Sequence, residues 1–360
     1  MSKRRLTKQQ LARIRERQAR KARLAAKSPD AEFETDPQTA NPLGPEQGGL
    51  VVARYRNQAD IRNEDGAIHR CYLRPTVETV VVGDRVTFQT VASPTDRVGD
   101  AEDPRAGVNT RAGVVVASGN RLNALQRPDS FGDLKTLAAN VSQVLVVIAP
   151  RPQAYANLID RYLVSAELLG ANAVIVLNKS DLIVDDESKQ DFEQLLAPYT
   201  PLGYSVVKVQ GKYEQIEALA DYLTDHTSIL VGQSGVGKTT LLNALVPEIN
   251  ERVGELSAEK EKGRHTTTTA RLFDIPTGGS LIDSPGIREF GLQHLERADV
   301  ERGFREFRTV IEPCRFRDCR HQGEPGCGLE QAAAENKIHS TRLASYRHIV
   351  GSLASDLERN

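Results

Sequence analysis

The sequence predicts a multidomain protein with an N-terminal OB-fold β-barrel, a central α/β domain and a C-terminal helical domain. Three observations predict this fold class. Short β-prone runs separated by turn residues lie before about residue 118, strands then alternate with helices up to about residue 290, and a Cys/His cluster interrupts the charged, helical remainder. We therefore expect a basic arm and linker over 1–47, the barrel over 48–118, the α/β domain over 119–290 and the helical domain over 291–360.

The composition is that of a cytoplasmic protein. At 360 residues with 39% hydrophobic side chains, the chain can form two or three domains with their own cores. It has no run of eighteen or more apolar residues, and its basic N-terminus lacks the apolar stretch of a secretory signal. Four cysteines are too few for a disulfide scaffold, which favours a reducing compartment. We expect no membrane contact.

The charge is unevenly distributed, with a cationic arm on an anionic body. Residues 1–27 contain eleven Lys or Arg side chains and one acid, Glu16. The rest of the chain carries 36 of the 47 basic and 47 of the 48 acidic side chains, a net charge of −11. Such an arm is typical of a segment that binds a polyanion, most often nucleic acid, although a solvated tail has the same composition. Residues 28–49 are rich in Pro, Gly, Asp and Glu, which indicates a linker.

Four short β-prone runs predict the barrel. Turn signals around Gly66 and Gly83 separate them. Several strands in so short a stretch favour an OB-fold, while periodicity alone leaves an SH3-like barrel open. Either barrel is a common platform for nucleic acid, and either can be a packing module. The runs are Leu50–Tyr55, Ala67–Leu73, Arg85–Val91 and Ala112–Ala117.

The central region has apolar runs that alternate with helical patterns. Helices are predicted over Ala156–Leu169 and Tyr213–Thr224. Continuous apolar runs between helices are typical of parallel strands buried on both faces, so we expect an α/β sheet covered by helices on its two sides. The predicted strands are Val144–Ala149, Ala173–Leu177, Ser205–Val209, Ser228–Val231, Leu272–Ile275 and Leu281–Ile282.

A phosphate-binding loop follows one of these strands. Residues 232–239 match G-x-x-x-x-G-K-[ST] and open a predicted helix over Thr240–Val246, a context that separates the motif from a simple glycine-rich turn. Backbone N–H groups and the helix N-terminus would bind the phosphates. Lys238 would reach the β- and γ-phosphates, and the Thr239 hydroxyl would bind Mg²⁺. The predicted nucleotide contacts here are Gly232, Ser234, Gly235, Val236, Gly237, Lys238, Thr239 and Thr240.

A guanine-reading motif, N-K-x-D, directly follows the strand Ala173–Leu177. The Asp181 carboxylate can accept from both N1–H and the N2 amine of guanine, whereas adenine has no donors there and would leave it unpaired. Asn178 would support the guanine face, and the stem of Lys179 would lie along the base. The motif therefore predicts a nucleotide site for GTP and GDP and argues against the rival hypothesis, a phosphate-loop ATPase.

Two further motifs complete the nucleotide site. Residues 283–286 fit D-x-x-G, so Asp283 would hold Mg²⁺ through water and the Gly286 N–H would contact the γ-phosphate. A threonine run lies between the phosphate loop and this motif, and Thr266 or Thr267 would bind Mg²⁺ in the GTP state. The guanine motif thus precedes the phosphate loop, so the predicted G domain is circularly permuted. A sheet tolerates this order because domain termini usually lie close together.

A Cys/His cluster near the C-terminus predicts a metal site. Its spacing is C-x4-C-x-H-x5-C, and three thiolates with one imidazole complete a tetrahedral zinc shell that has no open position. We expect one structural Zn²⁺ per chain, the alternative being coincidental free thiols. Cys71 stands apart and is expected to be a buried core residue. The predicted ligands are Cys314, Cys319, His321 and Cys327.

These motifs in this order resemble the small-ribosomal-subunit-dependent GTPase family (RsgA, also called YjeQ). The resemblance rests on the N-K-x-D motif, G-Q-S-G-V-G-K-T, G-R-H-T-T-T-T, D-S-P-G-I-R-E-F, the Cys/His cluster and the stretch I-D-R-Y-L at 159–163. It spans roughly residues 48 to 350, which leaves the basic arm outside it. It implies an OB-fold, a circularly permuted G domain and a zinc domain.

The resemblance also implies a function. It implies GTP hydrolysis stimulated by the small (30S) ribosomal subunit during late maturation of that subunit, with 16S rRNA as a contact and the protein a monomer. The alternative is a nucleotide-switched rRNA-binding module whose hydrolysis is incidental. One departure concerns residues 206–211, which lack the usual Ser/Ala-containing loop behind the guanine.

The water-orienting group is the open point of the predicted mechanism. Regulatory GTPases often place a glutamine after D-x-x-G, and here that position is Ile287, which cannot orient water. His265, beside the threonine run, is the best local candidate for this catalytic role, together with Lys238 as the charge partner of the phosphates. A group of the ribosome is the alternative, because a histidine in this position could equally contact RNA.

Overall fold

The computed structural model describes residues 43–77, 79–91, 111–129, 133–210, 216–246, 270–283, 295–310 and 314–359. The basic arm over 1–27, His265, the threonine run and Gly286 lie outside the described residues. Among the described helices, none is long and apolar enough to cross a membrane.

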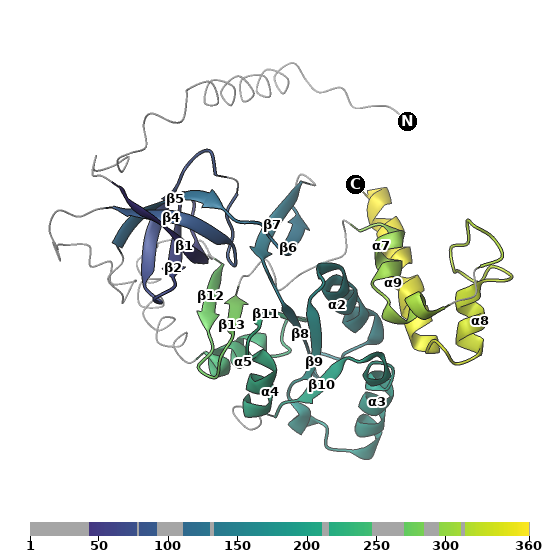
Figure 1. Ribbon diagram of the computed structural model, residues 1–360. Coiled ribbons are helices and arrows are strands. Elements are labelled where there is room, and N and C mark those ends of the chain that lie inside the picture. The colour runs from purple at the N-terminus through teal and green to yellow at the C-terminus, as the bar shows by residue number, and fades with distance from the viewer. Residues whose placement is uncertain are drawn as a thin grey trace.

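The N-terminal part is a five-stranded barrel (Figure 1). Its strands pair in the order β1-β2-β3-β5-β4 and close through a pairing of β4 with β1, with β3 and β5 parallel and the other pairs antiparallel. This Greek-key closure is that of an OB-fold, which confirms that prediction over the SH3-like alternative. Val51, Ile61 and Phe88 fill its core. The strands are β1 (Leu43–Arg54), β2 (Gln58–Asn63), β3 (Ile68–Leu73), β4 (Arg85–Val91) and β5 (Arg111–Ser118).

The first strand begins at Leu43, inside the segment that the composition indicated to be linker. The part of this strand from Leu43 to Leu50 pairs with β4 and contains Gly48 and Gly49. A Cβ at Gly49 would lie 2.4 Å from Cγ2 of Ile61 and 3.0 Å from the ring of Phe88. The glycine therefore lets the strand cross the barrel core closely, where the sequence pattern suggested a loose connection.

The α/β part continues the same sheet. From its outer edge, six strands run in the order β10-β9-β8-β11-β13-β12, and β12 pairs with β1 of the barrel. The strands from β10 to β13 are parallel, whereas β12 is antiparallel to β13. The chain enters the sheet at β8 and reaches β11 only after β9 and β10, as the permuted motif order predicts. The strands are β8 (Gln143–Ile148), β9 (Asn172–Leu177), β10 (Ser205–Lys208), β11 (Thr227–Val231), β12 (Arg271–Asp274) and β13 (Ser280–Asp283).

Helices cover both faces of this sheet. On one face, Ile159, Leu163 and Leu196 pack on inward-facing residues of the parallel strands. On the other face, Leu223 and Leu242 do the same. The helices are α2 (Ala156–Leu169) and α3 (Asp186–Leu196) on the first face, and α4 (Ile216–Leu223) and α5 (Lys238–Leu245) on the second.

A separate two-stranded hairpin joins the barrel to the α/β part. Strands β6 (Ala124–Pro128) and β7 (Leu134–Ala139) form it, and Val82 makes an isolated bridge with Ala138. The side chain of Asn140 donates to the carbonyl of Gly83 at 2.8 Å, fixing the exit of the hairpin on the barrel. No pattern in the sequence predicted this hairpin.

The C-terminal part packs on helix α2 (Figure 1). Val164 of α2 belongs to the same core as Phe304 and Tyr346, and a Cβ at Gly303 would lie 2.6 Å from Val164. Arg342, which is 1% exposed, forms ion pairs with Asp160 and Glu306 where the two parts meet. The elements are α7 (Arg297–Arg302), the 3-10 helix η4 (Arg305–Thr309), α8 (Gly328–Ala334) and α9 (Ser340–Arg359).

Candidate functional site

The phosphate loop connects β11 to α5 in the expected strand–loop–helix context. Gly232 has φ of 143°, and a Cβ there would lie 2.2 Å from the carbonyl oxygen of Val147. Gly237 has φ of 97°, and a Cβ there would lie 2.3 Å from Nδ2 of Asn178. Both positions therefore require glycine, so the loop's backbone path depends on these two residues of the motif.

Lys238 lies across its own loop. Its side chain is buried, and Nζ donates to the carbonyls of Gly232 at 2.7 Å and Gln233 at 2.6 Å. The next residues, Thr239 and Thr240, are exposed in the first turn of α5. The loop thus presents one ammonium group and the helix N-terminus to the same space, which is the arrangement that binds phosphates.

The N-K-x-D segment docks directly on the phosphate loop. Asn178 is buried and its Nδ2 donates to the carbonyl of Val236 at 2.8 Å. Lys179 has φ of 56°, and its Nζ donates to the carbonyl of Gly235 at 2.6 Å. Asp181 is exposed in the 3-10 helix η2 (Ser180–Leu182) that follows. The structure therefore brings together two motifs that lie more than fifty residues apart in the chain.

Asp283 ends β13, the strand beside β11. The register pairs Ile229 with Ile282, so Asp283 lies at the same edge of the sheet as the phosphate loop. Parallel strands direct ligands to their carboxyl ends, and Asp283 is therefore placed toward the nucleotide side.

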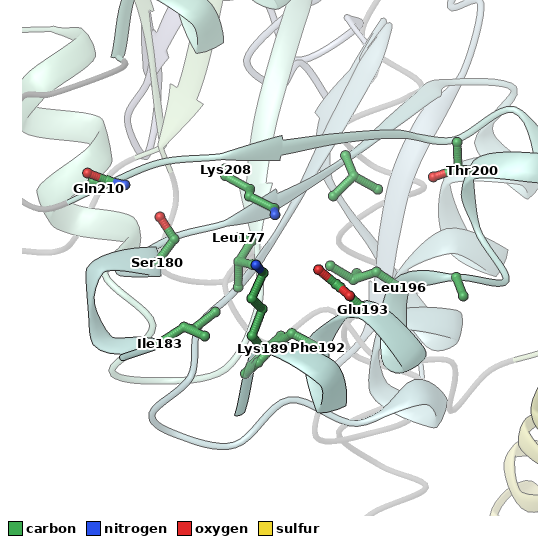
Figure 2. A pocket seen from close by; sticks show the side chains of 12 residues that line it. Leu177, Ser180, Ile183, Lys189, Phe192, Glu193, Leu196, Thr200, Lys208 and Gln210 are labelled. Carbon is green, nitrogen blue, oxygen red and sulfur yellow. The ribbon is translucent and has the colours of Figure 1, made fainter. Parts of the chain in front are cut away.

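A cavity of about 510 Å³ lies between α3 and the strands β9 and β10, beside the guanine-reading loop (Figure 2). Figure 2 shows Lys189 and Glu193 of α3 facing Leu177 and Lys208 of the sheet. The cavity follows from incomplete packing of α3, in which only Leu196 is buried. None of the predicted nucleotide contacts that fall within the described residues lines it. Its lining is Leu177, Ser180, Ile183, Lys189, Phe192, Glu193, Leu196, Ala197, Thr200, Val206, Lys208 and Gln210.

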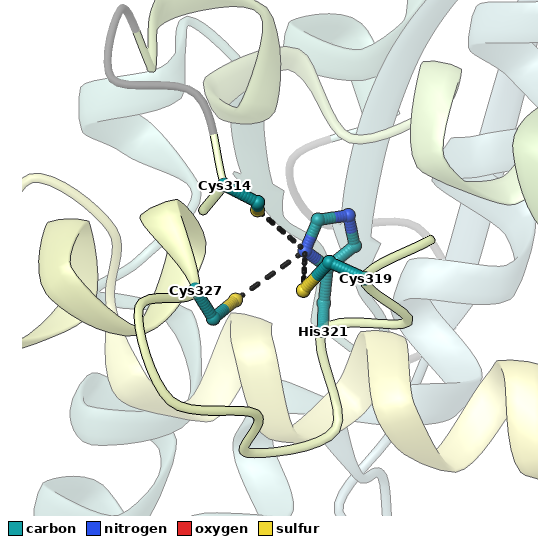
Figure 3. Close-up of side chains that lie close together, drawn as sticks. All are labelled: Cys314, Cys319, His321 and Cys327. Atoms are coloured by element: carbon teal, nitrogen blue, oxygen red, sulfur yellow. Dashed lines mark hydrogen bonds between the residues drawn. The ribbon is translucent and has the colours of Figure 1, made fainter. Parts of the chain in front are cut away.

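The predicted Cys/His ligands converge on one point (Figure 3). Their ligand atoms all lie within 4.8 Å of one another. Nδ1 of His321 is 3.5 Å from the Sγ of Cys314, 3.6 Å from that of Cys319 and 3.4 Å from that of Cys327. A tetrahedral ion with ordinary Zn–N and Zn–S bonds would separate these atoms by about 3.6 Å. The cluster therefore fits a four-coordinate metal ion.

Other groups, which no sequence motif indicated, orient these ligands. The Glu301 carboxylate lies 3.6 Å from Nε2 of His321, on the side away from the thiols. This interaction raises the pKa of His321 to about 9 and lowers the pKa of Glu301. The backbone N–H of Gly328 donates to the Sγ of Cys314 at 3.2 Å. Glu324 accepts from the N–H groups of Arg320 at 3.0 Å and Gln322 at 2.7 Å, which closes the loop.

The OB-fold barrel, the permuted sheet with its docked phosphate and guanine loops, and the Cys/His domain together define a circularly permuted GTPase. The family model described as RsgA GTPase matches residues 118–293. The Small ribosomal subunit biogenesis GTPase RsgA of Azotobacter vinelandii is 47% identical over 358 residues, covering 98% of each chain. That of Pseudomonas syringae pv. syringae is 46% identical and covers 99% of each. The chain belongs to the RsgA GTPase family and is a GTP hydrolase.

Solved structures agree with this assignment. YjeQ from Thermotoga maritima is 30% identical with a TM-score of 0.67, covering 86% of this chain and 99% of its own. YloQ, a circularly permuted GTPase, is 23% identical with a TM-score of 0.65 and matches the fold.

One expectation needs correction. The resemblance was expected to begin near residue 48, but the relatives align with 98% or more of the chain, so the aligned region takes in most of the basic arm.

Proposed function

We propose that this GTPase acts in the maturation of the small ribosomal subunit and that contact with the subunit stimulates its hydrolysis of GTP. The main support is structural: the guanine-reading loop is docked on the phosphate loop. In addition, the chain aligns over almost its whole length with proteins named for small-subunit biogenesis. The OB-fold barrel and the cationic arm supply surfaces suited to rRNA.

The nucleotide lies over the phosphate loop in this proposal. Asp181 accepts from guanine, Asn178 and Lys179 hold the base-reading loop on the phosphate loop, and Lys238 faces the β- and γ-phosphates. The backbone at Gly232, Ser234, Gly235, Val236, Gly237, Thr239 and Thr240 surrounds the phosphates, and the Gly286 N–H contacts the γ-phosphate.

Mg²⁺ accompanies GTP in phosphoryl transfer, because it neutralises charge on the phosphate oxygens. The proposed protein groups that would hold Mg²⁺ are Thr239, in the first turn of α5, and Asp283, at the end of β13. Thr266 or Thr267 adds a contact in the GTP state. His265 orients the attacking water, since the position after D-x-x-G is isoleucine.

The metal of the Cys/His cluster is proposed to be Zn²⁺, one per chain. Three sulfur donors and one imidazole match its preference, and the four-ligand set leaves no position for substrate, so its role is structural. It ties the loop over 314–328 to the helical C-terminal core, to which Cys319 and Cys327 both belong.

We propose a division into the arm and linker over 1–47, the barrel over 48–118, the G domain over 119–290 and the zinc domain over 291–360, with the first barrel strand beginning at Leu43 inside the first of these segments. The partners are the 30S subunit through its 16S rRNA and GTP or GDP, and the protein acts as a monomer in the cytoplasm.

The test is GTP hydrolysis by the full chain with and without purified small subunits, together with co-sedimentation in the presence of a GTP analogue or GDP. Stimulation by the subunit and tighter binding with the GTP analogue are expected. Nucleotide-dependent binding without stimulation would identify instead a switched rRNA-binding module whose hydrolysis is incidental.

A further inference from the structure

The β12–β13 hairpin lies between the barrel and the rest of the α/β sheet (Figure 1). Ala53 of β1 pairs with Arg271 of β12, and Arg271 in turn pairs with Asp283 of β13. A barrel residue, a hairpin residue and the aspartate assigned to Mg²⁺ therefore lie side by side on three neighbouring strands.

The side chain of Arg271 is held by the barrel. Its Nη2 donates to the hydroxyl of Tyr55 at 3.3 Å. The same hydroxyl donates to Oδ2 of Asp60 at 2.9 Å and accepts from Nη2 of Arg70 at 3.2 Å. A phenol has one donor and two acceptor sites, so these three hydrogen bonds use its full capacity. Arg70 also binds Asp60 and lies over the Tyr55 ring, 4.7 Å from its centroid.

Residues directly opposite each other in an antiparallel pair project from the same face, with Cβ atoms about 5 Å apart. Arg271 and Asp283 are such a pair. The Arg271 side chain therefore leaves the sheet beside Asp283 and on the same face. Because its guanidinium is held by the Tyr55 hydroxyl, Tyr55 sets where the Arg271 side chain lies next to that carboxylate.

We propose that Arg271, anchored by Tyr55, is a positioning residue for Asp283, so that the barrel determines how well the G domain binds Mg²⁺. This inference rests on the Mg²⁺ role assigned to Asp283 under the proposed function. Under this proposal the barrel affects the rate of GTP hydrolysis through Mg²⁺ binding, in addition to its use as a surface for RNA.

A second barrel–hairpin interaction supplies a matched control. Arg62 of β2 forms an ion pair with Asp274 at the opposite end of the hairpin, where Asp274 pairs with Ser280. Asp274 is exposed and Arg62 is half-buried, and the pair lies three residues along the strand from the Arg271–Asp283 pair. Replacing Arg62 breaks this ion pair and so removes a barrel arginine from the same interface. It leaves unchanged the end of the hairpin where Asp283 lies.

The experiment measures the Mg²⁺ concentration for half-maximal GTP hydrolysis by the full chain, without ribosomal subunits, alongside the melting temperature. The variants are Tyr55→Phe, Arg271→Gln, Arg271→Lys, the Tyr55→Phe/Arg271→Gln double variant, Arg62→Gln and Asp283→Asn. We expect Tyr55→Phe and Arg271→Gln each to raise the Mg²⁺ requirement roughly three- to tenfold, the scale of one ordinary hydrogen bond. Arg271→Lys, which keeps the charge, is expected to recover part of the loss.

The double variant decides between coupling and separate packing effects. If Arg271 acts through Tyr55, the double variant needs no more Mg²⁺ than the worse single variant, and Arg62→Gln matches the parent. An unchanged requirement in Tyr55→Phe, an additive double variant, or an equal shift in Arg62→Gln would overturn the proposal. A parental Mg²⁺ requirement in Asp283→Asn would overturn it together with the Asp283 assignment. Loss of subunit stimulation, measured separately, would count only against the proposed function.

Discussion

At the residue scale, base selection depends on a loop whose position is set by hydrogen bonds to backbone carbonyls. Asn178 and Lys179 donate to carbonyls of the phosphate loop, so the loop that carries Asp181 moves with the loop that binds the phosphates. The hydroxyl of Ser180, in the same guanine-reading loop, donates to the carbonyl of Val209 at 3.1 Å and so holds this loop on the segment after β10. Recognition of the base and of the phosphates is therefore mechanically linked through the two motifs.

Replacing Asp181 with Asn should weaken GTP binding by about 10²-fold or more, because the amide places a donor against one of the two guanine donors that the carboxylate accepts from. Xanthine carries an oxygen at C2, which accepts from the new amide, so xanthosine triphosphate should bind the variant better than GTP does. Titration of parent and variant with both nucleotides measures whether the preference changes from GTP to xanthosine triphosphate. Retention of parental GTP affinity would contradict the base-reading role of Asp181.

Replacing His265 with Ala should reduce subunit-stimulated hydrolysis by at least about 10²-fold, the scale of a group that orients water. Nucleotide affinity should change little, because the proposed role concerns the attacking water. Single-turnover hydrolysis with and without subunits gives the measurement. Full stimulated activity in His265→Ala would move that role to the ribosome.

Replacing Glu301 with Gln should weaken metal binding by roughly ten- to a hundredfold, the usual effect of removing a carboxylate behind a histidine ligand. The carboxylate faces Nε2 of His321 and so directs Nδ1 toward the three thiols. Competition with a zinc chelator compares parent and variant, with Cys319→Ser as the variant that lacks a ligand. Equal zinc retention in parent and Glu301→Gln would show that the ring is oriented without this carboxylate.

At the scale of elements, the G domain and the C-terminal part share helix α2. Arg342 reaches from α9 to Asp160 on α2 and to Glu306 on η4, all three being buried. Burial raises the pKa of Asp160, and the attraction of Arg342 opposes that rise. This ionic cluster fixes the two parts against each other.

Replacing Arg342 with Ala should therefore destabilise the chain by about 3–5 kcal/mol, because two carboxylates stay buried without their cation. The loss of stability should depend on pH with a definite sign. Without Arg342 the pKa of Asp160 in the folded state rises further above its unfolded value, so protonation favours the folded state and stability falls as pH increases. Melting temperatures between about pH 5.5 and pH 7.5 should show the variant approaching the parent at the acid end. A pH-independent difference would mean that the effect is one of packing.

The sequence predicted elements where periodicity is local and missed those that depend on distant partners. The helix predicted over Ala156–Leu169 has the bounds of α2, and the strand before N-K-x-D was placed to within one residue. The β2 strand was not predicted because only its three central residues are buried, and the polar residues on either side of them give no β-strand pattern. The Cys/His ligands were predicted from spacing, whereas Glu301 lies twenty positions before His321 with no motif to mark it. Likewise, nothing local indicates that Arg271 meets Tyr55, because the two residues are 216 positions apart.

At the scale of the whole molecule, barrel, hairpin and G domain form one hydrogen-bonded sheet, and the C-terminal part is fastened to α2 on one face. The cationic arm precedes this body, which is anionic. Opposite charges on one chain suit a protein that binds a polyanion through its arm while its body stays soluble.

Deleting residues 1–27 should weaken binding to small subunits and flatten its dependence on salt, because fewer rRNA phosphates are then neutralised and fewer counterions are released. Intrinsic GTP hydrolysis should survive, since no nucleotide motif lies in the arm. Co-sedimentation at several salt concentrations compares the truncated and full-length chains. Identical affinity and salt slope would identify the arm as a solubilising tail.

The attachment of α2 to the C-terminal part has a consequence for the order in which the chain is made. Asp160 and Arg342 are 182 positions apart, so at about 5–20 residues per second synthesis takes on the order of ten to forty seconds to supply the arginine. Throughout that interval the outer face of α2 is in contact with water. Asp160, Val164 and Leu168 of that face therefore lack the groups that cover them in the folded chain until the C-terminal part has been synthesised.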